Sequence, residues 1–219
     1  MKVSVIGGTG GMGFALALRL AKAGVEVVIG SRQAEKAAKA ALEILNVLGN
    51  AKVSGRVNPE AVKDCEVVFF TIPYEAVDEI ARSVAPALKE GCLAVSCIVS
   101  MNEDAISSAE FLASRLPSSA KVAAALHTVS ASAMMDVDKP LNMDTFIFGD
   151  DLEGKKTLAK LLSLIDGLRP IDGGPLKTSL YGEVFTRFLI GVNRRYGVGN
   201  TGLRVTGLKD EAVLKRWGM

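Results

Sequence analysis

The chain contains 219 residues, 49% of them hydrophobic and 23% charged, which is typical of a globular protein with a substantial core. Its net charge of +2 excludes a strongly basic nucleic-acid-binding surface, and its single histidine excludes a multi-histidine metal site, so we expect neither nucleic acid nor metal. No apolar run reaches the roughly 18 residues of a membrane span, and the three cysteines follow no zinc or disulfide pattern, so we expect a cytoplasmic protein with no membrane partner.

Apolar strands and amphipathic helices alternate along most of the chain. We predict strands over residues 2–6, 25–29, 53–57, 66–72, 92–99, 121–126 and 145–148, and a short apolar segment over 168–171. We predict helices over residues 14–23, 33–48, 74–88, 102–116 and 151–165. This alternation is typical of an α/β fold of Rossmann type, in which a doubly wound, mostly parallel sheet carries helices on both faces.

The pattern changes after Pro175. Apolar side chains then recur at helical spacing, which predicts a helix with one apolar face: Leu180, Val184, Phe185, Phe188, Leu189 and Val192. We therefore expect two parts, a Rossmann dinucleotide-binding domain over residues 1–175 and a small helical C-terminal lobe over residues 176–219. The apolar face would pack either on the first part or on a second subunit.

A glycine-rich turn follows the first predicted strand. It reads Gly8-Thr9-Gly10-Gly11-Met12-Gly13 and opens the first predicted helix, which is the setting of a dinucleotide-binding turn. In such turns the first glycine permits the tight turn, the second lets the backbone approach the pyrophosphate, and the third lets the helix pack on the strand. The pyrophosphate would then bind the free N–H groups at the positive end of the helix dipole.

The end of the second predicted strand indicates which dinucleotide binds. NAD-binding proteins usually place an acidic residue there to hold the ribose hydroxyls, but this chain has Ser31 and Arg32. The guanidinium of Arg32 suits a 2′-phosphate, the Ser31 hydroxyl can donate to it, and Lys36 lies one helical turn further on. The sequence therefore predicts NADP(H) as the cofactor.

Several motifs along the whole chain resemble one family, the F420:NADP oxidoreductases of archaea and actinobacteria. The matching segments are Val5-Ile6-Gly7-Gly8-Thr9-Gly10, Gly30-Ser31-Arg32, Thr71-Ile72-Pro73-Tyr74, Ala125-Leu126-His127-Thr128, Asp166-Gly167-Leu168-Arg169-Pro170 and Asn193-Arg194-Arg195-Tyr196-Gly197. The phosphate turn is shared by many families, whereas the last two segments are far more specific.

The resemblance implies a homodimeric enzyme that transfers a hydride directly between NADP(H) and the deazaflavin coenzyme F420. It implies that Thr9, Ser31, Arg32 and Lys36 hold the adenine-side phosphates. It also implies that Ile72, Pro73 and the turn around Met12 line the nicotinamide pocket. Ile98, Val99 and His127 would border the deazaflavin, with His127 as the candidate catalytic residue. Hydride transfer between two such rings needs little acid–base help, because the cofactors carry the chemistry.

Two departures from the family pattern fall on the side of the second substrate. Where the family typically has proline after the fifth strand, this chain reads Ile98-Val99-Ser100, and Ser130 stands where proline often follows the His-Thr pair. Two alternatives therefore remain open. One is an NADPH-dependent reductase of another acceptor, such as a flavin, a metal chelate or an imine, and the other is a non-catalytic NADP(H)-binding redox sensor.

Overall fold

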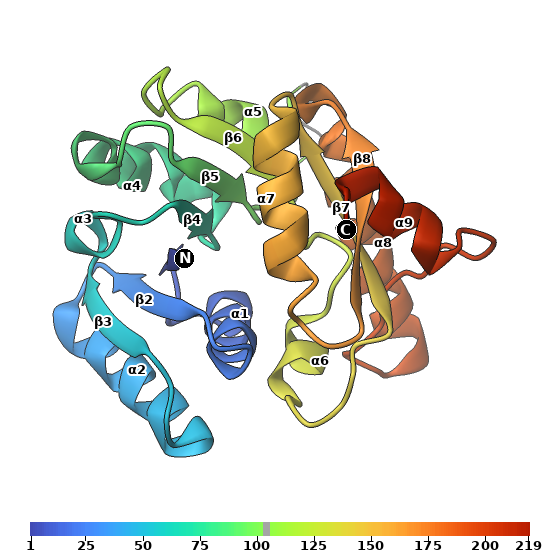
Figure 1. Ribbon diagram of the computed structural model, residues 1–219, viewed down its shortest axis with the longest axis horizontal. Helices are drawn as coiled ribbons and strands as arrows, with labels where there is room; N and C mark the ends of the chain where they lie inside the picture. The colour runs from blue at the N-terminus through green and yellow to red at the C-terminus, as the bar shows by residue number, and fades with distance from the viewer. Residues whose placement is uncertain (103–105) are drawn as a thin grey trace.

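The computed structural model describes residues 1–102 and 106–219, and its centre is one continuous sheet (Figure 1). Within these residues the sheet has eight strands in the order β3-β2-β1-β4-β5-β6-β7-β8. The strands are β1 (Lys2–Ile6), β2 (Glu26–Ser31), β3 (Val53–Val57), β4 (Val67–Phe70), β5 (Leu93–Ser96), β6 (Lys121–Ala124), β7 (Met143–Gly149) and β8 (Leu168–Gly174). All neighbours pair in parallel except β6 and β7, so the predicted Rossmann-type, mostly parallel sheet is confirmed.

Helices cover both faces of the sheet. The α-helices are α1 (Gly11–Lys22), α2 (Ala34–Leu48), α3 (Asn58–Ala61), α4 (Val77–Val84), α5 (Ser108–Ala113), α6 (Ala131–Met135), α7 (Leu152–Leu162), α8 (Leu180–Tyr196) and α9 (Asp210–Trp217). Buried side chains of α1, α2 and α7 pack on one face, and those of α3, α4 and α5 pack on the other. Successive strand residues point to opposite faces, which is why the strands read as unbroken apolar runs.

Several predicted elements differ from the structure in length. The helix predicted over 74–88 contains two 3₁₀ turns around α4, and the second holds Pro86, which cannot continue a helix. The helix predicted over 102–116 includes residues 103–105, which lie outside the described part, and α5 itself begins only at Ser108. Its start is fixed by a capping box between Ser107 and Glu110. Among the α-helices of the described residues, α3, α6 and α9 were not predicted.

The last segment of the chain folds back on β8. Arg169 donates from Nε and Nη2 to the two oxygens of the fully buried Asp144, at 2.8 Å each. The backbone N–H of Val205 donates to the same carboxylate, and Arg169 Nη1 donates to the side chain of Asp210 at the start of α9. At the other end of α9, the buried indole of Trp217 donates to the Pro170 carbonyl at 2.8 Å. These contacts place α9 against β8 on the right of Figure 1.

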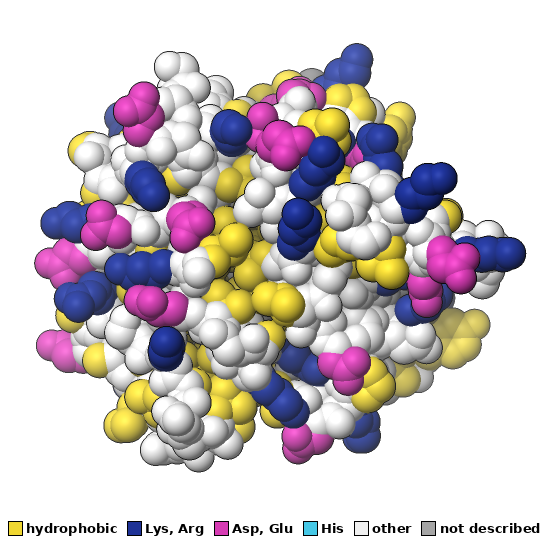
Figure 2. All heavy atoms as spheres, viewed as in Figure 1, with side chains coloured by type: hydrophobic (Ala, Val, Ile, Leu, Met, Phe, Trp, Pro, Cys, Tyr) yellow, Lys and Arg dark blue, Asp and Glu magenta, His cyan; other side chains and the backbone are white. Residues whose placement is uncertain are grey.

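Charges of both signs are interspersed over the face shown in Figure 2, with no large area of a single sign. This agrees with the net charge of +2. None of the helices in the described residues combines the length and apolar character that crossing a membrane requires. The three cysteines are free.

Candidate functional site

The glycine-rich turn between β1 and α1 is closed by backbone hydrogen bonds. The N–H of Gly8 donates to Val5 O at 3.2 Å, and the N–H of Gly10 donates to Gly7 O at 2.9 Å. The left-handed backbone that the tight turn needs belongs to Gly7, with φ of 80°, and not to Gly8 as the motif predicts. Gly8 serves close packing instead, because a Cβ there would lie 2.8 Å from the Val5 carbonyl oxygen.

The other glycines of the turn divide between packing and access. A Cβ on Gly13 would overlap Thr71 Oγ1 and the Gly7 carbonyl, so this glycine lets α1 approach β4. A Cβ on Gly10 would be 3.4 Å from its nearest neighbour, and one on Gly11 would meet no atom within 4 Å. The start of α1 carries neither a side-chain cap nor an acidic residue in its first turn. Its free N–H groups are therefore available to an anion.

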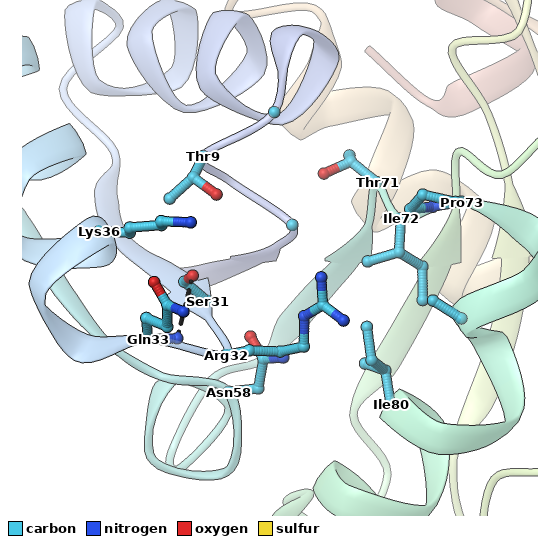
Figure 3. Close-up of a pocket in the computed structure, with 13 residues that line it drawn as sticks. Thr9, Ser31, Arg32, Gln33, Lys36, Asn58, Thr71, Ile72, Pro73 and Ile80 are labelled. Atoms are coloured by element: carbon cyan, nitrogen blue, oxygen red, sulfur yellow. Dashed lines mark hydrogen bonds between the residues drawn. The ribbon is translucent and has the colours of Figure 1, made fainter.

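A cavity of about 630 Å³ opens beside this turn, at the carboxyl ends of β1, β2 and β4 (Figure 3). The strand order reverses between β1 and β4, which is where open α/β sheets bind their ligands. Seven predicted residues line it together: Thr9, Gly10, Ser31, Arg32, Lys36, Ile72 and Pro73. Gly8, Gly11, Met12 and Gly13 belong to the adjoining turn but do not line the cavity. Ile98, Val99 and His127 do not line it either.

The lining is cationic on one side and apolar on the other. Lys36 and Arg32 extend into the cavity from α2 and from the end of β2, while Ile72 and Ile80 face them across it (Figure 3). No ion pair to a described residue engages either Arg32 or Lys36, and no carboxylate is among the lining side chains. Ser31 Oγ accepts from the Gln33 N–H at 3.3 Å, which orients the hydroxyl beside these cations. This arrangement fits the 2′-phosphate of NADP(H).

Sequence reasoning missed six lining residues. They are Gly7, Gln33, Asn58, Thr71, Ala76 and Ile80. Asn58 is 4% exposed and its Oδ1 has no hydrogen-bond partner in the described part of the chain. It directly follows β3, so the rule that ligands bind at the carboxyl ends of strands would have found it.

The residues predicted to border the acceptor lie further along the same edge of the sheet, after β5 and β6. Ile98 is buried, Val99 is half-buried, and His127 is 7% exposed. The Nε2 atom of His127 lies 3.2 Å from Ile98 O; because a carbonyl only accepts, Nε2 carries the proton. Burial lowers the pKa of His127 to about 4, with the bond to Ile98 opposing this shift, so the imidazole is neutral near pH 7.

The departure at Ser130 has a local structural reason. Its hydroxyl accepts from the Ala133 N–H and so caps α6, and it also donates to Gly199 O at 2.8 Å. Proline has no side-chain acceptor and would leave the start of α6 uncapped. Ser130 therefore ties α6 to the chain beyond α8.

The fold and the cavity define a dinucleotide-binding protein of Rossmann type. A family model described as NADP oxidoreductase, coenzyme F420-dependent, matches residues 2–100. The F420-dependent NADP reductases of Methanothermobacter thermautotrophicus and Methanothermobacter marburgensis are 36% and 38% identical to this chain. Each alignment covers 96% of the chain, and 97% and 100% of the respective relative. The chain therefore belongs to the family of F420-dependent NADP reductases.

A solved structure agrees in fold. A crystal structure from Arthrobacter sp. FB24, described as that of an F420-dependent NADP reductase, superimposes with a TM-score of 0.79 at 23% identity. The match covers 94% of this chain and 99% of that one.

Proposed function

We propose that this protein is an enzyme that transfers a hydride between NADP(H) and coenzyme F420. The observation that supports it most directly is the cavity at the strand switch point, where Ser31, Arg32 and Lys36 meet without a carboxylate. The family relationship supplies the second substrate. The two rings supply the chemistry, since a hydride can pass between C4 of a nicotinamide and C5 of a deazaflavin, and the protein must hold them in register.

We assign the roles of the dinucleotide side as follows. The turn from Gly8 to Gly13 binds the pyrophosphate: the N–H groups of Gly11, Met12 and Gly13 at the start of α1 face it, while Thr9 and Gly10 line the approach to it. Ser31, Arg32 and Lys36 bind the 2′-phosphate. Ile72 and Pro73 form the apolar wall beside the nicotinamide, where an environment low in water favours the transfer of a hydride over side reactions.

On the acceptor side, Ile98, Val99 and His127 form the wall next to the deazaflavin. His127 enters this wall as a neutral imidazole whose ring is oriented by the Ile98 carbonyl. A neutral ring adds no charge to either redox state of the acceptor, so activity should not depend on a histidine titration near pH 6.5.

Reduction of flavins, metal chelates or imines is not favoured, nor is a non-catalytic sensor. Both methanogen relatives carry the name F420-dependent NADP reductase and align along nearly their whole lengths. The test is a spectrophotometric assay of the purified protein with NADPH and coenzyme F420, followed at the deazaflavin absorption band. Fast bleaching with NADPH and slow bleaching with NADH is the expected result. Tight NADPH binding without bleaching would reject F420 as the acceptor.

We also propose that residues 176–219 act as a small helical lobe and that the enzyme is a cytoplasmic homodimer without nucleic-acid or membrane partners. Tyr181 and Phe188 on α8 are 65% and 60% exposed, and Val184 and Phe185 extend the same apolar stripe. Such a stripe is typical of a surface that a second copy covers. We expect dimers in sedimentation experiments and monomers for Phe188→Asp; a monomeric wild-type protein would contradict the proposal.

A further inference from the structure

A buried carboxylate on α8 has no place in the cofactor cavity or in the family motifs. Glu183 is 1% exposed, and no ion pair within the described residues engages it. Its Oε1 accepts from the Ser108 N–H at 2.7 Å, and its Oε2 accepts from the Ser100 N–H and the Ser108 hydroxyl at 2.8 Å each. A carboxylate buried without a cation is costly, so an arrangement with three donors calls for a reason other than stability.

The reason lies in what the three donors connect. Ser100 lies shortly after the end of β5 and Ser108 begins α5, so the two oxygens of one side chain bind the chain after β5 and the start of α5 together. One helical turn further on, Arg187 Nη1 donates to the carbonyls of Ser100 and Asn102, at 2.8 and 3.1 Å. Two oppositely charged side chains of α8 thus bind the N–H and the C=O of the same residue, Ser100.

These bonds form part of a closed ring of contacts around the acceptor wall, by which we mean Ile98, Val99 and His127. From Ser100 the chain leads back two residues to Ile98, whose carbonyl accepts from His127 Nε2. The carbonyl of His127 accepts in turn from Thr186 Oγ1 at 2.6 Å, which returns to α8. Glu183 and Thr186 lie three residues apart on one face of the helix. Ile98, Val99 and His127 are therefore all fixed relative to α8.

We propose that Glu183 is a positioning residue for the second substrate, which holds the Ile98–Val99 segment where the deazaflavin is to bind. This inference rests on the proposed function. Glutamate suits the task because the N–H groups of Ser100 and Ser108 both point at this side chain and each bonds a different oxygen. Glutamine offers only one oxygen, and its amino group would face one of the two N–H donors. A wall fixed before binding spares the substrate the cost of ordering it.

The test compares Glu183→Gln with Val213→Ala, a control that removes buried methyl groups from α9 and touches neither cofactor side. We expect Glu183→Gln to raise the Kd and the KM for F420 about tenfold, the size expected for losing one buried hydrogen bond to a charged group. The Kd for NADPH, measured by calorimetric titration, should stay within about twofold of the wild-type value, because neither Glu183 nor the segment that it holds lines the dinucleotide cavity. Amide exchange of residues 98–102 should accelerate in Glu183→Gln and not in Val213→Ala.

Each contrary result has a distinct meaning. If Glu183→Gln loses stability as Val213→Ala does while the Kd for F420 is unchanged, Glu183 is only structural and the inference is wrong. If the wild-type protein neither binds F420 nor reduces it with NADPH, the proposed function fails and the inference falls with it. Should Glu183→Gln not fold, Ser108→Ala removes a single donor and should raise the Kd for F420 about threefold. An unchanged Kd in that variant would overturn the proposal.

Discussion

Arg32 stands where an acidic residue would hold the ribose of NAD. Arg32→Asp removes the phosphate partner and supplies a ribose acceptor, so the binding free energy of NADPH should weaken by about 1.5–3 kcal/mol while NADH binding strengthens. Titrations of both dinucleotides measure this shift. Lys39→Asp makes the same change in charge on the nearby helix α2, outside the cavity, and should preserve the preference for NADPH. Equal losses for both dinucleotides in Arg32→Asp would contradict the assignment of the 2′-phosphate site.

The only histidine of the chain should give the folded protein a recognisable dependence on pH. The folded pKa of His127 is lowered to about 4 by burial, whereas an unfolded histidine titrates near 6.5. Between these two pH values the unfolded chain binds more protons than the folded protein does. The contribution of the neutral His127 to the free energy of unfolding is therefore complete above about pH 6.5. This contribution falls by about 1.4 kcal/mol per pH unit as the pH drops from 6.5 toward 4.

This contribution can be isolated by comparing wild type with His127→Gln, since glutamine keeps a donor for Ile98 but does not titrate. Urea unfolding of both proteins at several pH values measures the difference. The free energy of unfolding of the wild type should exceed that of His127→Gln by less and less as the pH falls from 6.5 to 4. A constant gap would mean that His127 is not buried as a neutral group.

The residues that the sequence predicted best belong to the dinucleotide side. Ser31, Arg32 and Lys36 follow from a rule about one position after one strand, and they do meet in the cavity. Glu183 could not be found in this way, because nothing next to it in the sequence shows that Ser100 and Ser108 converge on it. Contacts between residues some 80 positions apart depend on the tertiary fold, which local patterns do not encode.

At the scale of elements, different glycines of the phosphate turn serve cofactor binding and helix packing. Gly10→Val fills the open side of the turn, where the pyrophosphate would lie, so NADPH binding should weaken at least about tenfold with little change in Tm. Gly13→Ala would overlap Thr71 and the Gly7 carbonyl, so its main effect should be a loss of about 1–3 kcal/mol in unfolding free energy. Thermal unfolding and NADPH titration of both variants distinguish these outcomes. Retained binding in Gly10→Val would place the pyrophosphate elsewhere.

The sequence predicted long elements better than short ones. The strands β1, β2, β4 and β5 were predicted because buried parallel strands form continuous apolar runs. The segment 168–171, predicted only as a short apolar segment, is the start of strand β8. The short helices α3 and α6 have four and five residues, too few for a periodic pattern to show. The eight-residue α9 is amphipathic only over two turns, and its start depends on contacts with Arg169 that no local pattern reveals.

At the scale of the whole molecule, the junction around Arg169 closes the C-terminal segment onto the sheet. The hydrogen bonds to Asp144, together with the contact to Asp210, keep the pKa of the Arg169 guanidinium well above its usual value, although burial opposes this shift. Arg169→Met would leave Asp144 buried without its cation, so the free energy of unfolding should fall by about 3–5 kcal/mol.

Urea unfolding measures that loss, and limited proteolysis should show earlier cleavage within residues 203–210. Arg216→Met breaks a more exposed pair, between Arg216 of α9 and Asp172 of β8, and should cost less than about 1 kcal/mol. Similar losses in the two variants would show that the Arg169 junction adds little. The antiparallel pairing of β6 with β7, which brings Asp144 to this junction, was not predicted, because strand direction depends on the connections between strands.

The two substrate sites that we propose draw on different stretches of the chain. Every residue that lines the dinucleotide cavity lies between Gly7 and Ile80, whereas the acceptor wall is anchored by α8, which begins at Leu180. At about 5–20 residues per second, a ribosome makes the lining of the cavity roughly 5–20 s before it makes the start of α8. A half-made chain therefore already carries the side chains for the dinucleotide, and the site for the acceptor is completed only near the end of synthesis.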